Sequence, residues 1–302
     1  MRTLFQIWRV ACYEWFGALC SRRAVVVMLL YLAAAVCGMN WSISLLGKIE
    51  TELTQMLQLP VSEQSGVVST VIWKSIPFQK MVQAMVRDEL VYRDIVGRHP
   101  AELIFAWFSF FYSPLLVVLV SANRIADDLH SGAVRYMIMR VPRACWTLGK
   151  LVGQALLVAV AFAVSALGAY LVAWIRLRGV PDAPHLFFPM LDWSLRAWVY
   201  SFAYLGLTLG LSHLTRSGSK ATILGIIAVA VIFVLTAVCM IMARPEGWRS
   251  WLPYLLRILP TGPKDALWRM APATILSGSF YLITLGFCYL SAGYAVFRRR
   301  DA

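Results

Sequence analysis

Long runs of apolar residues, separated by shorter polar stretches, dominate the pattern of this sequence. Each run has the roughly 20 residues that an α-helix needs to cross the hydrocarbon core of a bilayer. The runs cover residues 24–46, 103–123, 151–175, 197–215, 221–243 and 273–297. Strands of a membrane barrel would instead alternate between apolar and polar positions. The pattern therefore predicts an all-α polytopic membrane protein, with a domain of six transmembrane helices over residues 24–302.

The first 23 residues have a different, amphipathic pattern. At 100° per residue, one half of a helix collects apolar side chains and the other half collects polar ones. The apolar half holds Leu4, Phe5, Trp8, Ala11, Cys12, Trp15, Phe16 and Leu19, and the polar half holds Arg2, Gln6, Arg9 and Tyr13. Residues 1–23 are therefore expected to form an interfacial helix. A signal peptide is the alternative, but its apolar core would begin only after Arg23, and Val36 does not suit a cleavage site.

Composition supports a membrane location over a soluble one. Hydrophobic residues make up 60% of the chain and charged residues 14%, which excludes a large soluble catalytic domain. The formal net charge of +13 suits the anionic inner surface of a membrane, so nucleic acid is not an expected partner. The six cysteines fall in apolar or predicted cytoplasmic segments, and no disulfide framework is expected.

Dense basic clusters set the predicted orientation. Arg22-Arg23 precede the first span, and Arg298-Arg299-Arg300 follow the last one. Lys and Arg are equally numerous on the two sides of the membrane, but these clusters directly adjoin spans, and such clusters stay on the cytoplasmic side. We therefore expect a multi-pass protein of the inner membrane with both termini in the cytoplasm. Lys74 and Arg249 would then lie outside.

The loop between spans two and three, residues 124–150, carries the most informative motif. Ser131 suits an N-cap, Gly132 allows a sharp turn, and Pro142 stops a helix. Apolar residues recur at helical spacing at Val134, Met137, Ile138 and Val141, flanked by Arg135, Arg140 and Arg143. An apolar ridge with basic edges suits docking into a groove on a soluble partner. Spacing alone, however, favours an ordinary solvated juxtamembrane loop.

Seven residues of this loop form an ordered motif: Asp127, Asp128, Gly132, Pro142, Arg143, Gly149 and Lys150. In this motif and in its overall layout, the chain resembles the permease subunits of type-2 ATP-binding-cassette (ABC) transporters, although the usual Thr-Leu after the glycine is Ala133-Val134. The resemblance implies an N-terminal elbow helix, a fold like that of type V exporters, and a coupling helix seated in a cleft of an ATPase subunit. The coupling residues that it implies are Asp127, Asp128, Gly132, Val134, Arg135, Met137, Ile138, Pro142 and Arg143.

The sequence shows no nucleotide-binding loop of its own. Gly149-Lys150 superficially matches the end of a phosphate-binding loop, but Ala144 and Leu151 replace the glycine and the Ser or Thr that the loop requires. We therefore expect no enzyme activity and no bound cofactor in this chain, with ATP and Mg²⁺ held by the partner. The expected partners are two copies of a soluble ABC ATPase subunit, a second permease chain, identical or different, and membrane lipid.

Polar residues are sparse within the predicted spans. No ionisable residue lies in the middle of a span, which argues against a proton- or sodium-coupled carrier. Hydroxyl side chains form stripes on two spans, at Ser109 and Ser113 and at Ser201, Tyr204, Thr208 and Ser212. Such stripes could line a substrate path, although hydrogen bonding between helices is their commoner role. Gly206 and Gly210 would permit a close contact between helices.

Two predicted outer segments carry less specific patterns. In residues 47–102, an amphipathic helix is expected around Phe78, Met81, Val82 and Met85. In residues 244–272, Trp and Pro interrupt apolar pieces that are too short to span, which predicts broken or re-entrant helices. The four histidines, His99, His130, His185 and His213, are scattered along the chain, so no metal site is expected.

Three functions compete on these observations. The first is the membrane half of an ATP-driven exporter that works as a pair of permeases with two ATPase subunits. The second is a conformational transmitter that passes ATP-driven motion to a periplasmic partner without carrying cargo, a role that the long outer segment 47–102 could serve. The third, a membrane-embedded enzyme, is the weakest because no Ser/His, Asp/Asp or His/Glu constellation lies in the spans.

Overall fold

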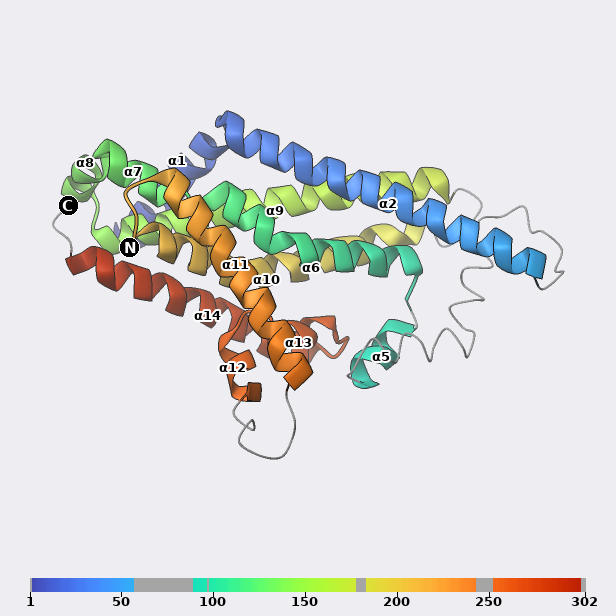
Figure 1. Ribbon diagram of the computed structural model, residues 1–302. Coiled ribbons are helices and arrows are strands. Elements are labelled where there is room, and N and C mark those ends of the chain that lie inside the picture. The colour runs from blue at the N-terminus through green and yellow to red at the C-terminus, as the bar shows by residue number, and fades with distance from the viewer. Residues whose placement is uncertain (1, 57–88, 97, 178–182, 243–251, 300–302) are drawn as a thin grey trace.

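The computed structural model describes residues 2–56, 89–96, 98–177, 183–242 and 252–299 (Figure 1). Within these residues the chain is helical and contains no strand, so the all-α prediction is confirmed. The helices are α1 (Arg2–Leu19), α2 (Arg22–Met56), α5 (Glu89–Val96), α6 (Pro100–Ser121), α7 (Arg124–Ser131), α8 (Ala133–Arg140), α9 (Arg143–Arg176), η1 (Ala183–Leu186), α10 (Phe187–Ser212), α11 (Gly218–Met242), α12 (Leu252–Ile258), α13 (Lys264–Trp268) and α14 (Pro272–Arg299). The helix expected around Met81, and also Lys74 and Arg249, lie outside the described residues.

Five helices in the described part of the chain are long and apolar enough to cross a membrane: α2, α6, α9, α11 and α14. Each overlaps one of the predicted spans: α2, α9 and α14 contain theirs, and α6 and α11 end at Ser121 and Met242, within theirs. The remaining predicted span, 197–215, corresponds to α10, which begins earlier than expected and contains an ion pair between Arg196 and Asp192 (2.7 Å). Helix α10 contacts α6, α9, α11 and α14. A helix surrounded by protein can carry more polar side chains than one exposed to lipid, so this ion pair is compatible with the position of α10.

Glycines bring α10 and α14 into backbone contact. A Cβ atom added to Gly206 would meet the backbone of Gly286, and one added to Gly293 would meet the backbone of Gly210. The close contact predicted for Gly206 and Gly210 is therefore confirmed, with α14 as the neighbour. Small residues allow helices in a membrane to approach until their backbones touch.

Helix α1 packs along two successive turns of α9. A Cβ on Gly149 would lie 2.5 Å from Cβ of Val10, and a Cβ on Gly153 would lie 2.8 Å from the carbonyl oxygen of Ala11. Many apolar side chains of α1 remain exposed, among them Leu4 (72%) and Phe16 (61%). The helix thus has an apolar exposed side in addition to the side that contacts α9.

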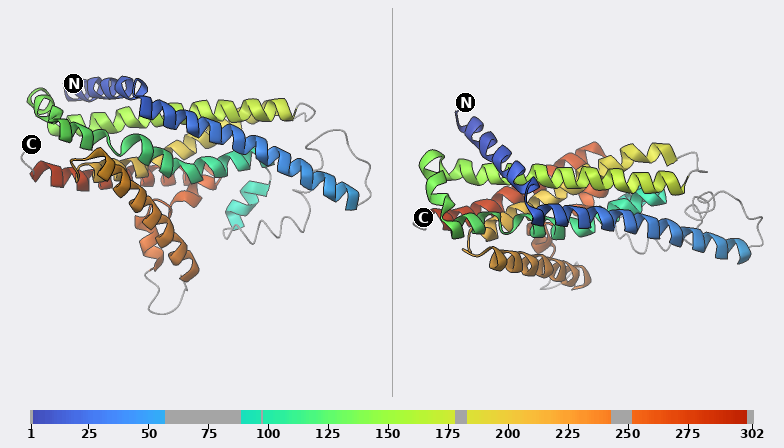
Figure 2. Two further views of the ribbon diagram at one scale, coloured as in Figure 1. Left: turned by 45° about the horizontal axis from the view of Figure 1, so that its top comes forward. Right: turned by 90° about the horizontal axis from the view of Figure 1, so that it is seen from above.

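The long helices α2, α6, α9, α10 and α14 run roughly alongside one another, whereas α11 leans away from them (Figures 1 and 2). The start of α1 and the end of α14 lie at the same end of this bundle as α7 and α8. Consistent with this arrangement, Nη1 of Arg143 at the start of α9 donates to the carbonyl oxygen of Arg298 in α14 (3.3 Å). Arg143 and Arg298, two basic residues that flank predicted spans, therefore meet at this end of the molecule.

Two short helices, α12 and α13, lie between α11 and α14, in agreement with the broken helices predicted for 244–272. The carbonyl groups at the C-terminal ends of α12 and α13 have no partner within their own helix. Side chains of the long helices donate hydrogen bonds to them. Nη1 of Arg196 donates to the carbonyl oxygens of Leu267 (2.9 Å) and Arg269 (2.8 Å) at the end of α13. The hydroxyl of Tyr289 donates to the carbonyl oxygen of Ile258 at the end of α12 (2.5 Å).

Candidate functional site

The inner loop forms a helical hairpin that bends at Gly132. Helix α7 ends at Ser131, and Gly132 then adopts a left-handed conformation with φ of 72° before α8 begins. Glycine has no Cβ and adopts this conformation without steric penalty. Pro142 occupies the N-cap position of α9. The predicted short helix between two breaks is confirmed, but Ser131 is not its N-cap, because Gly132 holds that position and Ser131 belongs to α7.

The apolar ridge predicted on this helix turns toward the chain itself. Val134 is only 2% exposed, and Met137 and Ile138 are half-buried against the hydrophobic core. The expectation that the ATPase subunit buries Val134 is therefore wrong, because residues of the chain itself already cover this side chain. Instead, Tyr136 and Met139 are 77% and 84% exposed.

A distinct face of α8 is left free for contact with another protein. It consists of Arg135, Tyr136, Met139 and Arg140, all of which are exposed, and is called the exposed α8 face below. Residues three and four apart are neighbours on a helix surface, so these four side chains form one patch. The patch combines two apolar side chains with two guanidinium groups.

The two adjacent acids of α7 anchor the hairpin in two directions. Oδ2 of Asp127 accepts a hydrogen bond from Nδ2 of Asn123 (2.7 Å). Oδ1 of Asp127 lies against Gly218, the first residue of α11, and a Cβ atom on Gly218 would collide with it. A carboxylate is favourable at the N-terminal end of a helix. Oδ2 of Asp128 forms an ion pair with Nζ of Lys150 on α9 (2.8 Å). The hairpin is thus fixed to α11 and α9.

Lys150 is also paired with an acid of α1. Its Nζ lies 2.8 Å from Oε2 of Glu14, and Oε1 of Glu14 accepts a hydrogen bond from Nε2 of Gln154 (2.8 Å). Lys150 and Glu14 are only 3% and 8% exposed. Buried charges are stable only when they are paired and hydrogen-bonded. We call the set of Glu14, Ser121, Arg124, Asp128, Lys150 and Gln154 the Lys150 network.

Arg143 joins the other side of the hairpin to α14. In addition to its bond to Arg298, its guanidinium lies 5.7 Å from the ring centroid of Phe297. The Phe297 ring in turn lies 5.8 Å from that of Trp146 on α9 and 5.3 Å from that of His213, the C-cap of α10. These contacts connect the ends of α9, α10 and α14 beside the hairpin.

The geometry of the hairpin is that of a mechanical connection to the long helices. One face of α8 is exposed, while the hairpin that carries it is fixed to α1 and α9 by paired charges and lies against the start of α11. In the part of the chain that the structure describes, no three His, Cys, Asp or Glu side chains converge as metal ligands do. A force applied to α8 would be passed to several of the long helices.

A comparison with protein-family models gives a match to the family described as ABC-2 family transporter protein, over residues 8–302. The chain belongs to this ABC-2 family. A search of curated proteins found no match. Members of the ABC-2 family are membrane components of ABC transporters, and membership implies association with an ABC ATPase subunit. With its apolar helices, the chain is a multi-pass membrane permease.

The residues predicted to line a path are buried within this ABC-2 chain. Their exposed fractions are 0% for Ser109, Ser113 and Tyr204, 1% for Thr208 and 2% for Ser201. Oγ of Ser113 and Oγ of Ser201 donate to carbonyl oxygens of their own helices, at Phe110 (3.2 Å) and Trp198 (2.6 Å). In this arrangement they contribute to helix packing, and a role in lining a path stays a prediction that requires α6 and α10 to separate.

Sequence reasoning missed three buried charged residues of the ABC-2 chain. Glu14 lies beside the apolar half of an amphipathic helix, a position that signals a buried partner. Glu102, 3% exposed, accepts a hydrogen bond from Nε1 of Trp193 (2.7 Å). Arg196, 7% exposed, lies between Asp192 and the end of α13. Both residues directly precede predicted spans, but Glu102 lies in the first turn of α6 and Arg196 lies inside α10, so each helix begins before the predicted span.

Proposed function

We propose that this chain is the permease of an ATP-driven exporter, in which a separate ATPase subunit drives substrate across the inner membrane. The observation that supports this function best is the exposed α8 face, carried by a hairpin that the Lys150 network fixes to α1 and α9. Tyr136 and Met139 suit a shallow apolar cleft on the ATPase, and Arg135 and Arg140 suit carboxylates at its rim. ATP and Mg²⁺ are held by that ATPase, and this chain binds no cofactor.

In this proposal the chain crosses the membrane six times. Helix α10 is the sixth, because it contacts α6, α9 and α14 and buries Arg196 and its hydroxyl stripe within the chain. Helix α1 is the elbow helix at the membrane surface, where its exposed apolar side meets lipid. Both termini lie in the cytoplasm together with α7 and α8. Arg22, Arg23 and Arg298 adjoin the cytoplasmic ends of their spans in this orientation.

Two permease chains and two ATPase subunits form the proposed complex. Helix α11 leans away from the bundle and exposes large apolar side chains, including Ile223 (57%), Val234 (61%) and Ile241 (78%). A second permease chain, identical or different, packs against this helix. The path then lies between the two chains, which accounts for the burial of the hydroxyl stripes within a single one.

The second candidate is a conformational transmitter that acts on a periplasmic partner and carries no cargo. Burial of the five hydroxyl residues in the chain favours it over a path through one chain. The two candidates make the same prediction for ATPase binding, and they differ in whether substrate crosses the membrane.

The test uses the chain co-expressed with a soluble ABC ATPase and purified as a complex. The proposal expects ATP turnover only in the complex, and ATP-dependent movement in proteoliposomes of small molecules that co-purify with it. ATP turnover without such movement supports the transmitter. Turnover by the isolated chain that is lost when its own residues are mutated would contradict both.

A further inference from the structure

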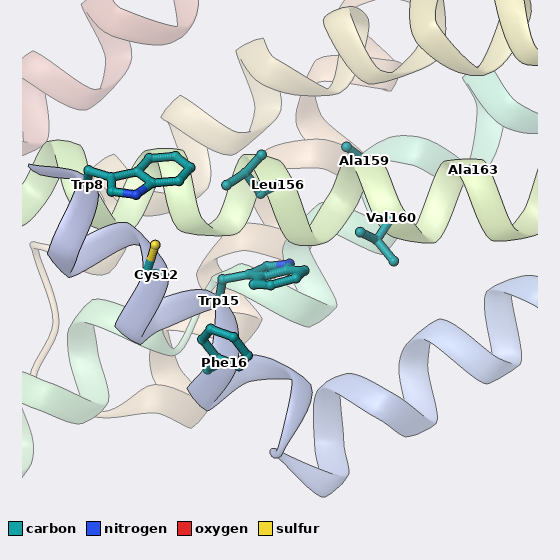
Figure 3. Close-up of a pocket in the computed structure, with 8 residues that line it drawn as sticks. All are labelled: Trp8, Cys12, Trp15, Phe16, Leu156, Ala159, Val160 and Ala163. Carbon is teal, nitrogen blue, oxygen red and sulfur yellow. The ribbon is translucent and has the colours of Figure 1, made fainter.

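An apolar groove runs between α1 and α9, with a volume of about 470 Å³ (Figure 3). Trp8, Trp15 and Phe16 form its wall on α1, and Leu156, Ala159 and Ala163 are among the residues that form its floor on α9. The groove exists because small side chains on α9 leave space that the aromatic rings of α1 border without filling.

The groove continues along α9 toward α10. A second hollow of about 630 Å³ is lined by the same three α9 residues, Leu156, Ala159 and Ala163, and on α10 by Leu195 and Trp198 among others. The two hollows therefore form one elongated depression along the surface of α9, bordered by α1 at one end and by α10 at the other. We call this depression the α9 groove.

The depth of the α9 groove in the membrane restricts what fills it. Leu156 to Ala163 lie in the first half of the predicted span 151–175, on α9, a 34-residue helix that qualifies as a membrane span. No water is available at this depth to solvate polar groups. A long, flexible and apolar molecule fits a narrow surface depression of this kind, and the bilayer supplies such molecules as acyl chains.

Positive charge lies beside the surface end of the same groove, on Arg9, which belongs to the polar half of α1 and has its guanidinium 5.6 Å from the ring centroid of Phe5. Arg9 is exposed and follows Trp8, one helical turn before Cys12, and both of these residues line the groove. Its neighbour Val10 contacts Gly149 near the start of α9, which places Arg9 toward the membrane surface. Glu14 is engaged with Lys150, so it does not neutralise Arg9.

One polar atom at the groove also lacks a partner. Nε1 of Trp15 is buried and has no hydrogen-bond acceptor among the described residues. A buried indole N–H normally has one. The glycerol ester carbonyl of a phospholipid is an acceptor that lies between the headgroup and the acyl chain. With the phosphate near Arg9 and the acyl chain near Ala163, this carbonyl would lie between those two residues.

We propose that the α9 groove is a binding site for an anionic phospholipid, with one acyl chain along Leu156 to Ala163 and the phosphate beside Arg9. The site is separate from the exposed α8 face, and it depends only on membrane insertion, not on ATP coupling. It would make the contact between α1 and α9 sensitive to lipid composition.

The test measures lipid retention by native mass spectrometry of the full chain, released from micelles that contain phosphatidylglycerol or phosphatidylcholine in equal amounts. The expected result is about one retained phosphatidylglycerol per chain. Arg9→Gln should lower its retention about fivefold, the factor that one basic residue contributes near an anionic surface, while Arg216→Gln, on an exposed loop residue, should not.

A groove-filling variant tests the acyl-chain contact. Ala163→Phe should lower retention of both lipids at least about tenfold, because losing contact with only two methylene groups has an effect of that size. Val164→Phe is the matched control, since Val164 is the next residue, is 43% exposed and does not line the groove. Equal retention of the two lipids, or no effect of Ala163→Phe, overturns the proposal. So does a change of oligomeric state in Ala163→Phe, which would make the groove a contact between chains.

Discussion

The ammonium of Lys150 on α9 and the carboxylate of Glu14 on α1 are 2.8 Å apart and almost completely buried. This pair connects the first helix of the chain to the helix that follows the exposed hairpin. The same ammonium also binds Asp128 of α7 (2.8 Å), so α1 and the hairpin share one cation. Movement of the hairpin would therefore act directly on α1 as well as on α9.

The first prediction concerns the strength of this pair. Lys150→Met should destabilise the folded chain by about 3 kcal/mol, because it leaves the buried Glu14 carboxylate without its closest cation. The double variant Glu14→Gln with Lys150→Met should recover part of that loss, since no unpaired acid then remains at Glu14. Thermal unfolding of the purified chain in micelles measures both effects. Additive effects of the two single substitutions would show that the pair is not coupled.

The helices of this fold were largely predictable from the sequence. Apolar runs fix where a chain crosses a membrane, because every backbone group there must be satisfied within the helix. The bounds of α6 and α10 were less accurate. Glu102 and Arg196 looked like the limits of spans, yet Trp193 and the end of α13 provide the hydrogen bonds that allow them to be buried. Such partners are distant in sequence and leave no local pattern.

The candidate site was predictable in its position but not in its orientation. Gly132 and Pro142 marked the ends of α8 because one adopts a positive φ and the other begins a new helix. The ridge that contains Val134 and Met137 could equally face a partner or the chain's own core, since both environments select apolar side chains. Burial in the folded chain decides between them, and this information is not present in helical spacing.

The second prediction tests the contact between α10 and α14. Gly206→Leu should prevent the two backbones from approaching, and overpacking of this kind destabilises a fold by about 1–3 kcal/mol or more. Gly47→Leu is the control, because nothing lies within 4 Å of a Cβ at Gly47. A circular-dichroism melt of the purified chain measures the difference. Equal melting temperatures for the two variants would argue against the close contact.

The third prediction concerns the cap on α13. Arg196→Ala removes the donors to the carbonyls of Leu267 and Arg269, and each buried carbonyl left unsatisfied costs about 1–3 kcal/mol. Asp192→Asn removes only the ion pair with Arg196. The Asp192 side chain is 49% exposed, so the effect of this substitution should stay below about 1 kcal/mol. Limited proteolysis of the segment around α13 should increase in the first variant alone.

The fourth prediction tests the orientation of the chain in the membrane. In a background without the native cysteines, a single cysteine at Tyr254 of α12 should react with a membrane-impermeant thiol reagent in intact cells, because Tyr254 is 63% exposed at the proposed outer side. A single cysteine at Arg299 should react only after the cells are opened. Labelling of position 299 in intact cells would reverse the proposed topology.

The last prediction concerns the exposed α8 face. Met139→Asp or Tyr136→Asp places a charge in the proposed contact with the ATPase, and an unpaired charge that loses its water is strongly unfavourable. Each variant should abolish co-purification of the ATPase and lower ATP turnover by more than about tenfold, which corresponds to the 1.5–3 kcal/mol of one buried large side chain. Membrane insertion should remain normal, because neither side chain packs inside the chain.

Two control variants separate this interface from folding. Tyr13→Asp makes the same change at a side chain that is 70% exposed on α1, and it should leave ATPase binding intact. Val134→Asp buries a charge within the chain itself, since Val134 is 2% exposed, and it should lower the melting temperature of the permease alone. If Met139→Asp and Tyr136→Asp both retain the ATPase and its turnover, α8 is a solvated connector and the coupling proposed for this loop is wrong.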